Sequence, residues 1–247
     1  METTPNRSVI ICATQRSGST MVCEDLTTAN IGRPEEWFLK WQNDHKSFDE
    51  QALEQIYESG TSDSGIFGLK LMASQLVKTN WLLAPVVQAK SDGRPFAALR
   101  ALVQSPEWVW IRRRDSIAQA VSHFLAKKSG VYHVVKSEQG FRPGSFVSEA
   151  NHSTKISDVE FDFKGIMAEW YSIQRDTLIC SMFFEATAIK PIEIWYEDYT
   201  GSLVEHLASQ FGVTVNTEGK ERNLTRMPQG RSQDMRHKFV EELFARA

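Results

Sequence analysis

The chain has 247 residues, 41% of them hydrophobic and 24% charged, and its 28 Lys and Arg against 31 Asp and Glu give a net charge of −3. This balance excludes an overall positive field of the kind that gathers nucleic acid, so local groups would have to hold any anionic ligand. No apolar run approaches the roughly 18 residues of a membrane span, and three cysteines without C-x-x-C spacing favour a reducing compartment. We therefore expect a single domain over residues 1–247, cytoplasmic, with no membrane span and no nucleic-acid partner.

A short buried strand is predicted near the N-terminus. Residues 10–13 are an apolar run bounded by small residues, and a loop of small polar residues follows them. Residues 17–30 then have helical spacing. A strand, a tight loop and a helix form a phosphate cradle, because backbone N–H groups and the positive end of the helix dipole converge there. A plain turn with an N-cap is the alternative interpretation.

This loop matches the P-loop pattern G-x-x-x-x-G-K-[ST] only in part. Gly18 and Thr20 fit, but Ala13 takes the place of the first glycine and Ser19 that of the lysine. In NTPases that lysine contacts the β- and γ-phosphates, so its absence argues against an NTPase. A cation is still present, at Arg16.

Two adjacent carboxylates, Glu35 and Glu36, come after the first predicted helix and precede two aromatic residues. Gly32 and Pro34 end that helix and begin the loop. The pattern fits either a helix start with a hydrophobic anchor or a carboxylate directed at a reaction centre. Taken alone, it favours the structural interpretation.

A second buried strand is predicted over residues 66–72, after a helix over 47–59. It contains Lys70, which lies either in water at the strand end or in a site. We favour the site, because ligands in open α/β sheets collect at the carboxyl ends of the strands. Residues 75–90 predict a helix with Trp81 facing inward and a kink at Pro85.

The densest cationic cluster follows the next strand. A short helix over 95–104 precedes this strand, at 107–111, which leads directly into three arginines at 112–114. Asp115 can then cap a helix over 116–127. A charge run is more often a solvated face, but its place between a strand and a helix favours an anion site.

The second half of the chain continues the alternation of strands and helices. Residues 129–160 have little periodicity, and we interpret them as a mobile segment over the acceptor side of the site. The remaining predicted elements are a long helix over 162–188 whose apolar set includes Leu178 and Met182, a strand over 191–199, a helix over 201–211, a basic loop over 219–231 and a helix over 232–247. This order predicts an α/β fold with a mostly parallel sheet flanked by helices on both faces.

Four motifs follow one another along the chain: Gln15-Arg16-Ser17-Gly18-Ser19-Thr20, Gly32-x-Pro34-x-Glu36-x-Phe38, Gly68-Leu69-Lys70-Leu71-Met72, and Arg113-Arg114-Asp115 with Gln119-Ala120-Val121-Ser122. In this order they resemble the bacterial carbohydrate sulfotransferases related to trehalose 2-sulfotransferase. The resemblance covers residues 9–240, more weakly between 129 and 160. It implies a P-loop-NTPase-like fold. It also implies transfer of a sulfuryl group from 3′-phosphoadenosine 5′-phosphosulfate (PAPS), the co-substrate, to a hydroxyl group of a sugar or glycolipid.

The resemblance also implies two anion sites for this donor. The first loop would bind the 5′-phosphosulfate through Gln15, Arg16, Ser17, Gly18, Ser19 and Thr20. An arginine followed eight residues later by a serine would bind the 3′-phosphate. Arg114 and Ser122 have that spacing, and Arg113 is the alternative. The basic loop with Arg226 and Arg231 resembles the segment that closes over the nucleotide, although a solvated loop is nearly as good an interpretation.

The general base differs between subfamilies. Cytosolic eukaryotic sulfotransferases carry a histidine two positions after the strand lysine, where this chain has Met72, which cannot take a proton. Trehalose-type enzymes use a glutamate of the G-x-P-x-E-F loop, which is Glu36 here. The resemblance thus implies Glu36 as the base, with Arg16 and Lys70 stabilising the leaving phosphate. Arg33 and Trp37 of the same loop would lie near the acceptor, where both depart from the pattern common in relatives.

Two other functions stay open: a nucleotide-dependent phosphotransferase of the P-loop type, and an inactive nucleotide- or glycan-binding protein. The six histidines show no ligand spacing, so we expect no metal. Relatives of this kind are often dimers, and a homodimer is expected. Trp41, Trp81 and Trp108 are candidates for exposed contacts, with burial in the core as the favoured alternative.

Overall fold

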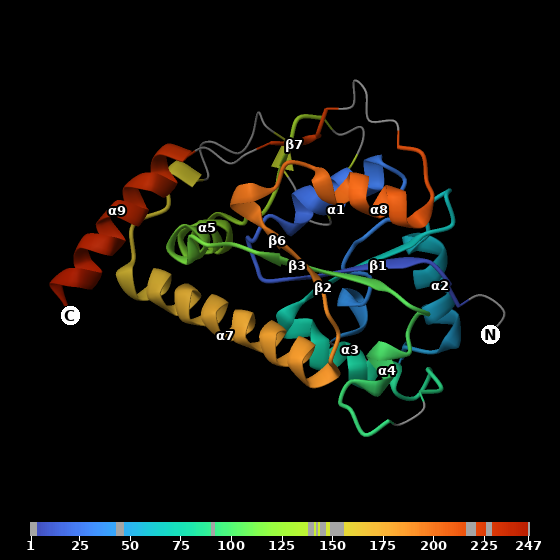
Figure 1. Cartoon of the computed structure of the whole chain (residues 1–247). Coiled ribbons are helices and arrows are strands. Elements are labelled where there is room, and N and C mark those ends of the chain that lie inside the picture. Colours follow the sequence, from blue (N-terminus) through green and yellow to red (C-terminus); the bar gives the residue numbers. More distant parts are fainter. Residues whose placement is uncertain are drawn as a thin grey trace.

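A parallel sheet of four strands forms the centre of the computed structural model, which describes residues 4–42, 47–89, 92–137, 141, 143, 147–148, 156–215, 221–225 and 229–246 (Figure 1). Its order is β2-β1-β3-β6, and each neighbouring pair is parallel. The strands are β1 (Ser8–Ala13), β2 (Phe67–Met72), β3 (Glu107–Arg112) and β6 (Ile192–Trp195). The predicted α/β class with a parallel sheet is confirmed, and the arrangement is consistent with a P-loop-like sulfotransferase fold.

Helices cover both faces of this sheet, which explains why its strands are apolar runs without polar alternation (Figure 1). Successive residues of β1 point to opposite faces, so Ile11 packs in the core beside α1 and α8, and Ile10 in the core on the other face. The helices are α1 (Ser19–Thr28) and α8 (Ser202–Phe211) on the first face, and α2 (Glu50–Gly60), α3 (Leu76–Leu83), α4 (Ala97–Arg100) and α7 (Phe163–Thr187) on the second. None of the helices described is both long and apolar enough to cross a membrane.

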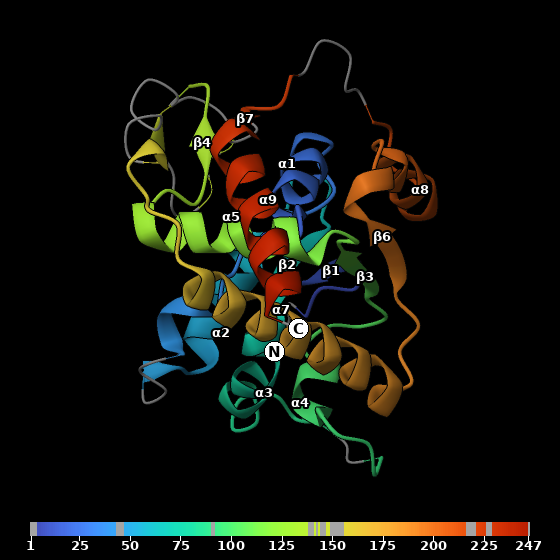
Figure 2. The same cartoon turned by 90° about the vertical axis from the view of Figure 1, so that its left-hand side faces the viewer.

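A third core cluster lies beside the sheet, where α5 (Ser116–Ser129) and α9 (Gln229–Ala245) pack with α7 (Figure 2). A small second sheet adjoins it, in the order β5-β4-β7, with β4 antiparallel to β7. Its strands are β4 (Val134–Val135), β5 (Val147–Ser148) and β7 (Leu224–Thr225), and the 3-10 turns are η1 (Leu39–Trp41), η3 (Ala73–Gln75) and η5 (Tyr196–Asp198). The mobility expected for residues 129–160 stays a prediction.

Two details of the predicted helices are wrong. The helix expected over 75–90 ends at Leu83, because Pro85 lacks an N–H and its ring clashes with the preceding turn, and Trp81 is 67% exposed. On α7, Leu178 and Met182 are 59% and 58% exposed. That helix carries apolar residues around much of its circumference, but only the faces toward the sheet and α5 are covered. Trp41 and Trp108 are buried, as the favoured interpretation held.

The register of the sheet brings the carboxyl ends of all four strands to one edge. Ala13 pairs with Met72 on one side and Ile111 on the other, and Arg112 pairs with Trp195. The residues that follow β1, β2, β3 and β6 therefore meet at this edge, where the sequence predicts the site.

Candidate active site

The loop after β1 turns sharply into α1. Arg16 has φ 60° and Gly18 has φ 89°, so both residues have left-handed backbone conformations. Gly18 is the N-cap of α1 and provides no side-chain cap, and no hydrogen bond within the described part of the chain uses the N–H of Ser19 or Thr20. The N-terminus of α1 therefore has donors available for an anion.

Gly18 also lies against the ring of Tyr196 in η5. A Cβ atom at this position would lie 2.3 Å from a ring carbon of Tyr196. Only glycine combines the positive φ with this close approach.

Replacing Gly18 with Ala is expected to lower the free energy of unfolding by about 2–4 kcal/mol, from left-handed strain and overpacking against Tyr196. Gly65→Ala is the matched control, because Gly65 has φ 76° and nothing lies within 4 Å of its added Cβ. We expect that control to lose only about 1 kcal/mol. Urea denaturation measures both variants, and equal losses would show that the Tyr196 contact carries no cost.

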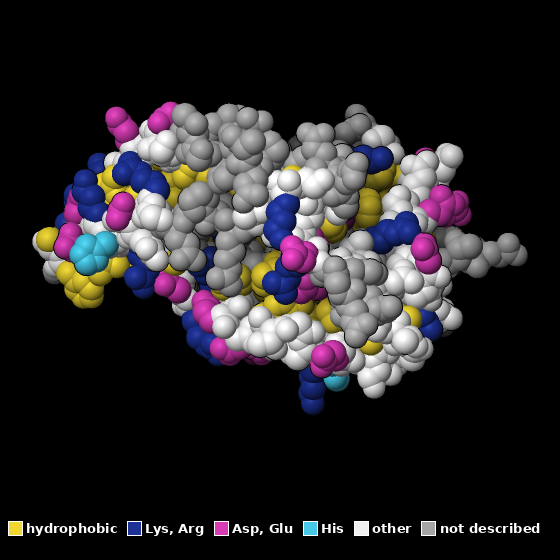
Figure 3. All heavy atoms as spheres, turned by 90° about the horizontal axis from the view of Figure 1, so that it is seen from above, with side chains coloured by type: hydrophobic (Ala, Val, Ile, Leu, Met, Phe, Trp, Pro, Cys, Tyr) yellow, Lys and Arg dark blue, Asp and Glu magenta, His cyan; other side chains and the backbone are white. Residues whose placement is uncertain are grey.

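A cavity of about 480 Å³ opens above this loop, within the size range of small-molecule sites. Its walls come from the edge of the sheet, α5, η5, the second sheet and α9, and include Gln15, Arg16, Gly18, Ser19, Thr20, Glu36, Lys70, Met72, Arg113, Ser122, Tyr132, His133, Tyr196, Arg222 and Arg236. Basic and acidic side chains are interspersed on the molecular face of Figure 3, with no broad area of one sign. Among the residues described, no three His, Cys, Asp or Glu side chains are grouped so that they could hold a metal ion.

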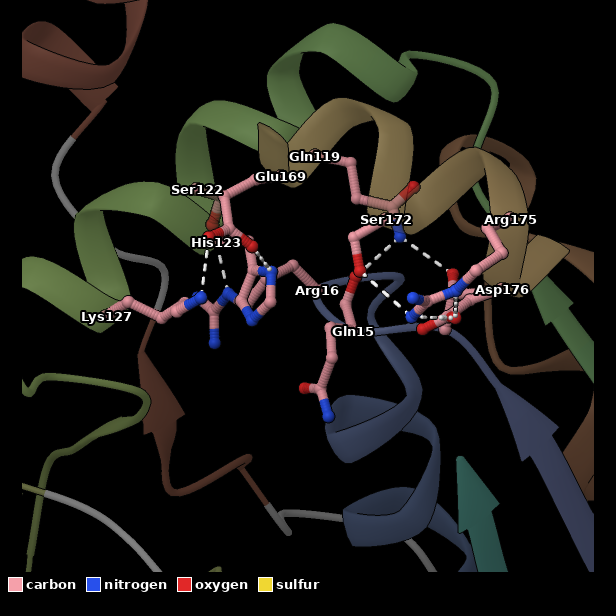
Figure 4. Close-up of polar contacts among 11 residues, drawn as sticks. Gln15, Arg16, Gln119, Ser122, His123, Lys127, Glu169, Ser172, Arg175 and Asp176 are labelled. Atoms are coloured by element: carbon pink, nitrogen blue, oxygen red, sulfur yellow. Dashed lines mark hydrogen bonds and ion pairs between the residues drawn. The ribbon is translucent and has the colours of Figure 1, made fainter. Parts of the chain in front are cut away.

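Arg16 connects the first loop to α5 and to the second sheet. Its Nε donates to Ser122 Oγ at 3.0 Å (Figure 4), and its Nη1 donates to the carbonyl of Tyr132. Burial and the nearby charge of Arg113 lower the pKa of Arg16 to about 10, so the guanidinium remains charged at neutral pH. Gln119 supports the loop by donating to Thr14 Oγ1 at 2.8 Å.

Arg113 and Arg114, which directly follow β3, lie in different surroundings. Arg113 lines the cavity, donates from Nη1 to the carbonyl of Arg16 at 3.1 Å and packs 4.8 Å from the centre of the Tyr196 ring. Its Nε is buried and has no hydrogen-bond partner in the described structure. Arg114 instead forms a bidentate pair with Asp198, at 2.6 and 2.5 Å, and does not line this cavity. The structure thus brings Arg113, rather than Arg114, to the same cavity as Ser122.

Glu36 and Lys70 form an ion pair on the opposite wall. Lys70 Nζ lies 3.1 Å from Glu36 Oε1, and Gln75 Nε2 donates to Glu36 Oε2 at 2.6 Å. The backbone N–H of Met72 donates to Gln75 Oε1 at 3.0 Å and fixes that amide. Burial lowers the pKa of Lys70, but Glu36, Cys23 and Glu35 together outweigh this effect, so the pKa lies above its ordinary value. One carboxylate is thereby held in the cavity beside a permanent cation.

Other predicted residues lie apart from this cavity. Arg33 pairs with Asp63 at 2.9 Å on the surface, and Trp37 Nε1 donates to the carbonyl of Gly68 at 3.1 Å. Arg231 donates to the carbonyl of Val159. None of Arg33, Trp37 and Arg231 lines the cavity. The position predicted for Arg226 falls outside the described residues.

Several cavity residues were not predicted as site residues, among them His133, Tyr196, Arg222 and Arg236. Arg222 pairs with Asp25 of α1 at 2.6 Å, and Arg236 of α9 pairs with Asp115 at 3.0 Å. Tyr196 directly follows a strand that ends at the edge of the site, so its place in the sequence could have predicted its role as a cavity residue. Arg222 lies in the basic loop predicted over 219–231, whereas His133 and Arg236 come from segments without a motif that points to the cavity.

Comparison with known proteins places the chain in a family. The family model described as Stf0 sulphotransferase matches residues 8–241. The chain belongs to the Stf0 sulphotransferase family. The trehalose 2-sulfotransferase of Mycobacterium tuberculosis (strain ATCC 35801 / TMC 107 / Erdman) is 26% identical over 157 residues, covering 51% of this chain. The matched stretch spans 59% of the length of that relative. The resemblance found in the motifs of this Stf0 chain is confirmed.

Proposed function

We propose that this Stf0 chain is a sulfotransferase that moves a sulfuryl group from PAPS to a hydroxyl group of a sugar or glycolipid. One observation carries the proposal: a single cavity joins an anion site at the N-terminus of α1 to the Glu36 carboxylate. Family membership and the trehalose 2-sulfotransferase relative support the reaction type and the sugar acceptor.

The donor side of the cavity fits a phosphosulfate. The N–H groups of Ser19 and Thr20 and the charge of Arg16 would bind the 5′-phosphosulfate, and the absence of a Walker lysine fits a ligand without a γ-phosphate. Arg113 and Ser122 would bind the 3′-phosphate. The buried Arg113 Nε, without a partner in the described structure, fits a bound anion, whereas Ser17 is fully buried and does not line the cavity.

The acceptor side would supply the base. PAPS provides an activated sulfuryl group, whose bond to the phosphate oxygen breaks as the acceptor oxygen attacks sulfur. Glu36 would take the proton of the attacking hydroxyl, whose acidity rises as the new bond forms. Arg16 and Lys70 would stabilise the negative charge that develops on the leaving phosphate. No step of this mechanism calls on a metal ion.

The cellular setting and assembly belong to the same proposal. Cys12, Cys23 and Cys180 are free and buried, which supports a reducing, cytoplasmic location. A homodimer is proposed from the family resemblance, and its molar mass in solution can be measured by light scattering.

Calorimetric titration with adenosine 3′,5′-bisphosphate (PAP), the donor product, tests the nucleotide site. We expect binding in EDTA, and Arg113→Ala is expected to weaken it by ~10–100-fold, the effect of one lost charge-assisted hydrogen-bond group. Arg114→Ala is the matched control and is expected to change affinity by less than ~3-fold, because its surface ion pair with Asp198 lies outside the cavity.

The opposite ranking of the two variants would move the 3′-phosphate to Arg114. Absence of PAP binding would contradict the proposal, and magnesium-dependent binding of ATP in its place would favour a phosphotransferase. Binding of PAP without transfer to any acceptor would favour an inactive binding protein.

A further inference from the structure

His133 lines the same cavity as Arg16, Glu36 and Lys70, yet it belongs to none of the four motifs. Within the described structure, neither nitrogen of its imidazole has a hydrogen-bond partner. A neutral imidazole offers one donor and one acceptor. The His133 imidazole can therefore form hydrogen bonds with a hydroxyl group of a ligand in the cavity.

Both neighbouring residues in the chain fix the position of His133. The carbonyl of Tyr132 accepts a hydrogen bond from Arg16 Nη1, and Val134, only 1% exposed, pairs with Thr225 of β7. The backbone that carries the imidazole is thus fixed on both sides, to the first loop through Tyr132 and to the second sheet through Val134. A fixed group loses little freedom on binding a ligand, which suits a residue that orients a substrate.

The electrostatic surroundings keep this side chain uncharged. Burial, together with the nearby charges of Arg16 and Lys70, lowers the pKa of His133 to about 3. A proton placed on His133 would thus be opposed by both cations. Glu36 is paired with Lys70, and the neutral His133 is available for hydrogen bonding.

We propose that His133 binds and orients the acceptor sugar by hydrogen bonding to one of its hydroxyl groups. This inference rests on the proposed sulfotransferase function and deepens it. A sugar hydroxyl both donates and accepts, so a neutral imidazole can satisfy it in either sense. His133 sets the position of the acceptor relative to Glu36, and it is a positioning residue that does not take the reacting proton.

Steady-state kinetics with trehalose as the acceptor and PAPS as the donor tests this assignment. His133→Phe keeps a planar ring but removes both nitrogens, and is expected to raise the KM for the acceptor at least ~10-fold, the loss of one buried hydrogen bond or more. His133→Asn keeps a donor and an acceptor and is expected to recover most of that loss. PAP affinity is expected to stay within ~3-fold of wild type in both variants. His206→Asn on α8 is the control, because His206 is exposed and outside the cavity.

The outcomes separate this inference from the proposed function. If wild-type protein transfers the sulfuryl group but His133→Phe leaves the acceptor KM unchanged, the inference is wrong and the function stands. A loss of ~10²-fold in kcat at unchanged KM, in both His133 variants, would instead make His133 the general base and overturn the positioning role. If the wild type binds no PAP and transfers nothing to trehalose or other sugars, the proposed function fails and the inference with it.

Discussion

Turnover is expected to fall at least ~10²-fold in Glu36→Gln, while the affinity for PAP stays nearly unchanged. The amide keeps the size of the side chain, and its one oxygen can still accept from either Lys70 or Gln75, but it cannot take a proton from the attacking hydroxyl. Steady-state rates and calorimetry on the same preparations measure both quantities.

Glu35→Gln is the matched control for this experiment. The backbone carbonyl of Glu35 accepts a hydrogen bond from the N–H of Lys70 at 2.9 Å, and this contact does not depend on the side chain. Burial raises the pKa of Glu35, and its side chain does not line the cavity. We expect turnover within ~3-fold of wild type. Near-normal turnover in Glu36→Gln together with a large loss in Glu35→Gln would transfer the role of base to Glu35.

Removing the cation of the Lys70–Glu36 ion pair is expected to lower both stability and turnover. Lys70→Met keeps the apolar part of the side chain but leaves Glu36 without its cation, and we expect the free energy of unfolding to fall by about 2–3 kcal/mol. This is below the range for fully buried pairs, because the Glu36 side chain is 24% exposed. Turnover is also expected to fall at least ~10²-fold, since Lys70 faces the charge that develops during transfer.

A double-mutant cycle separates these two effects. In Lys70→Met/Glu36→Gln no unpaired charge remains, so at least about 1 kcal/mol of the stability lost in Lys70→Met is expected to return. Turnover is expected to stay as low as in the single variants, because both functional groups are gone. Urea denaturation and rate measurements on the four proteins test this. Strictly additive losses of stability would contradict the ion pair.

The sheet and the location of the site were accessible from the sequence. Apolar runs such as residues 10–13 and 107–111 predict buried parallel strands, and parallel strands bring the residues after them to one edge. The sequence alone therefore predicts that Lys70 and the first loop lie in the site. The choice of Glu36 depended instead on the family resemblance, since Glu35 and Glu36 are equivalent by pattern alone.

The remaining parts of the site depend on side-chain directions that a pattern does not set. β3 ends at Arg112, the first of three consecutive arginines, and the twist of the chain there decides that Arg113 enters the cavity while Arg114 pairs with Asp198. His133 is brought to the cavity by the pairing of β4 with β7, strands of two residues each without a periodicity to detect. Pairing between such distant short segments is decided by tertiary packing.

Transfer of a sulfur-labelled sulfuryl group from PAPS is the most direct test of the proposed function. The protein is incubated in EDTA with labelled PAPS and with trehalose, other glucosides or glycolipid acceptors, and in parallel with magnesium and labelled ATP. We expect label on at least one sugar acceptor. The labelled product should form in an amount equal to that of PAP, and Glu36→Gln should abolish its formation. Label that stays on PAPS with every acceptor, or phosphoryl transfer from ATP in its place, would contradict the proposed function.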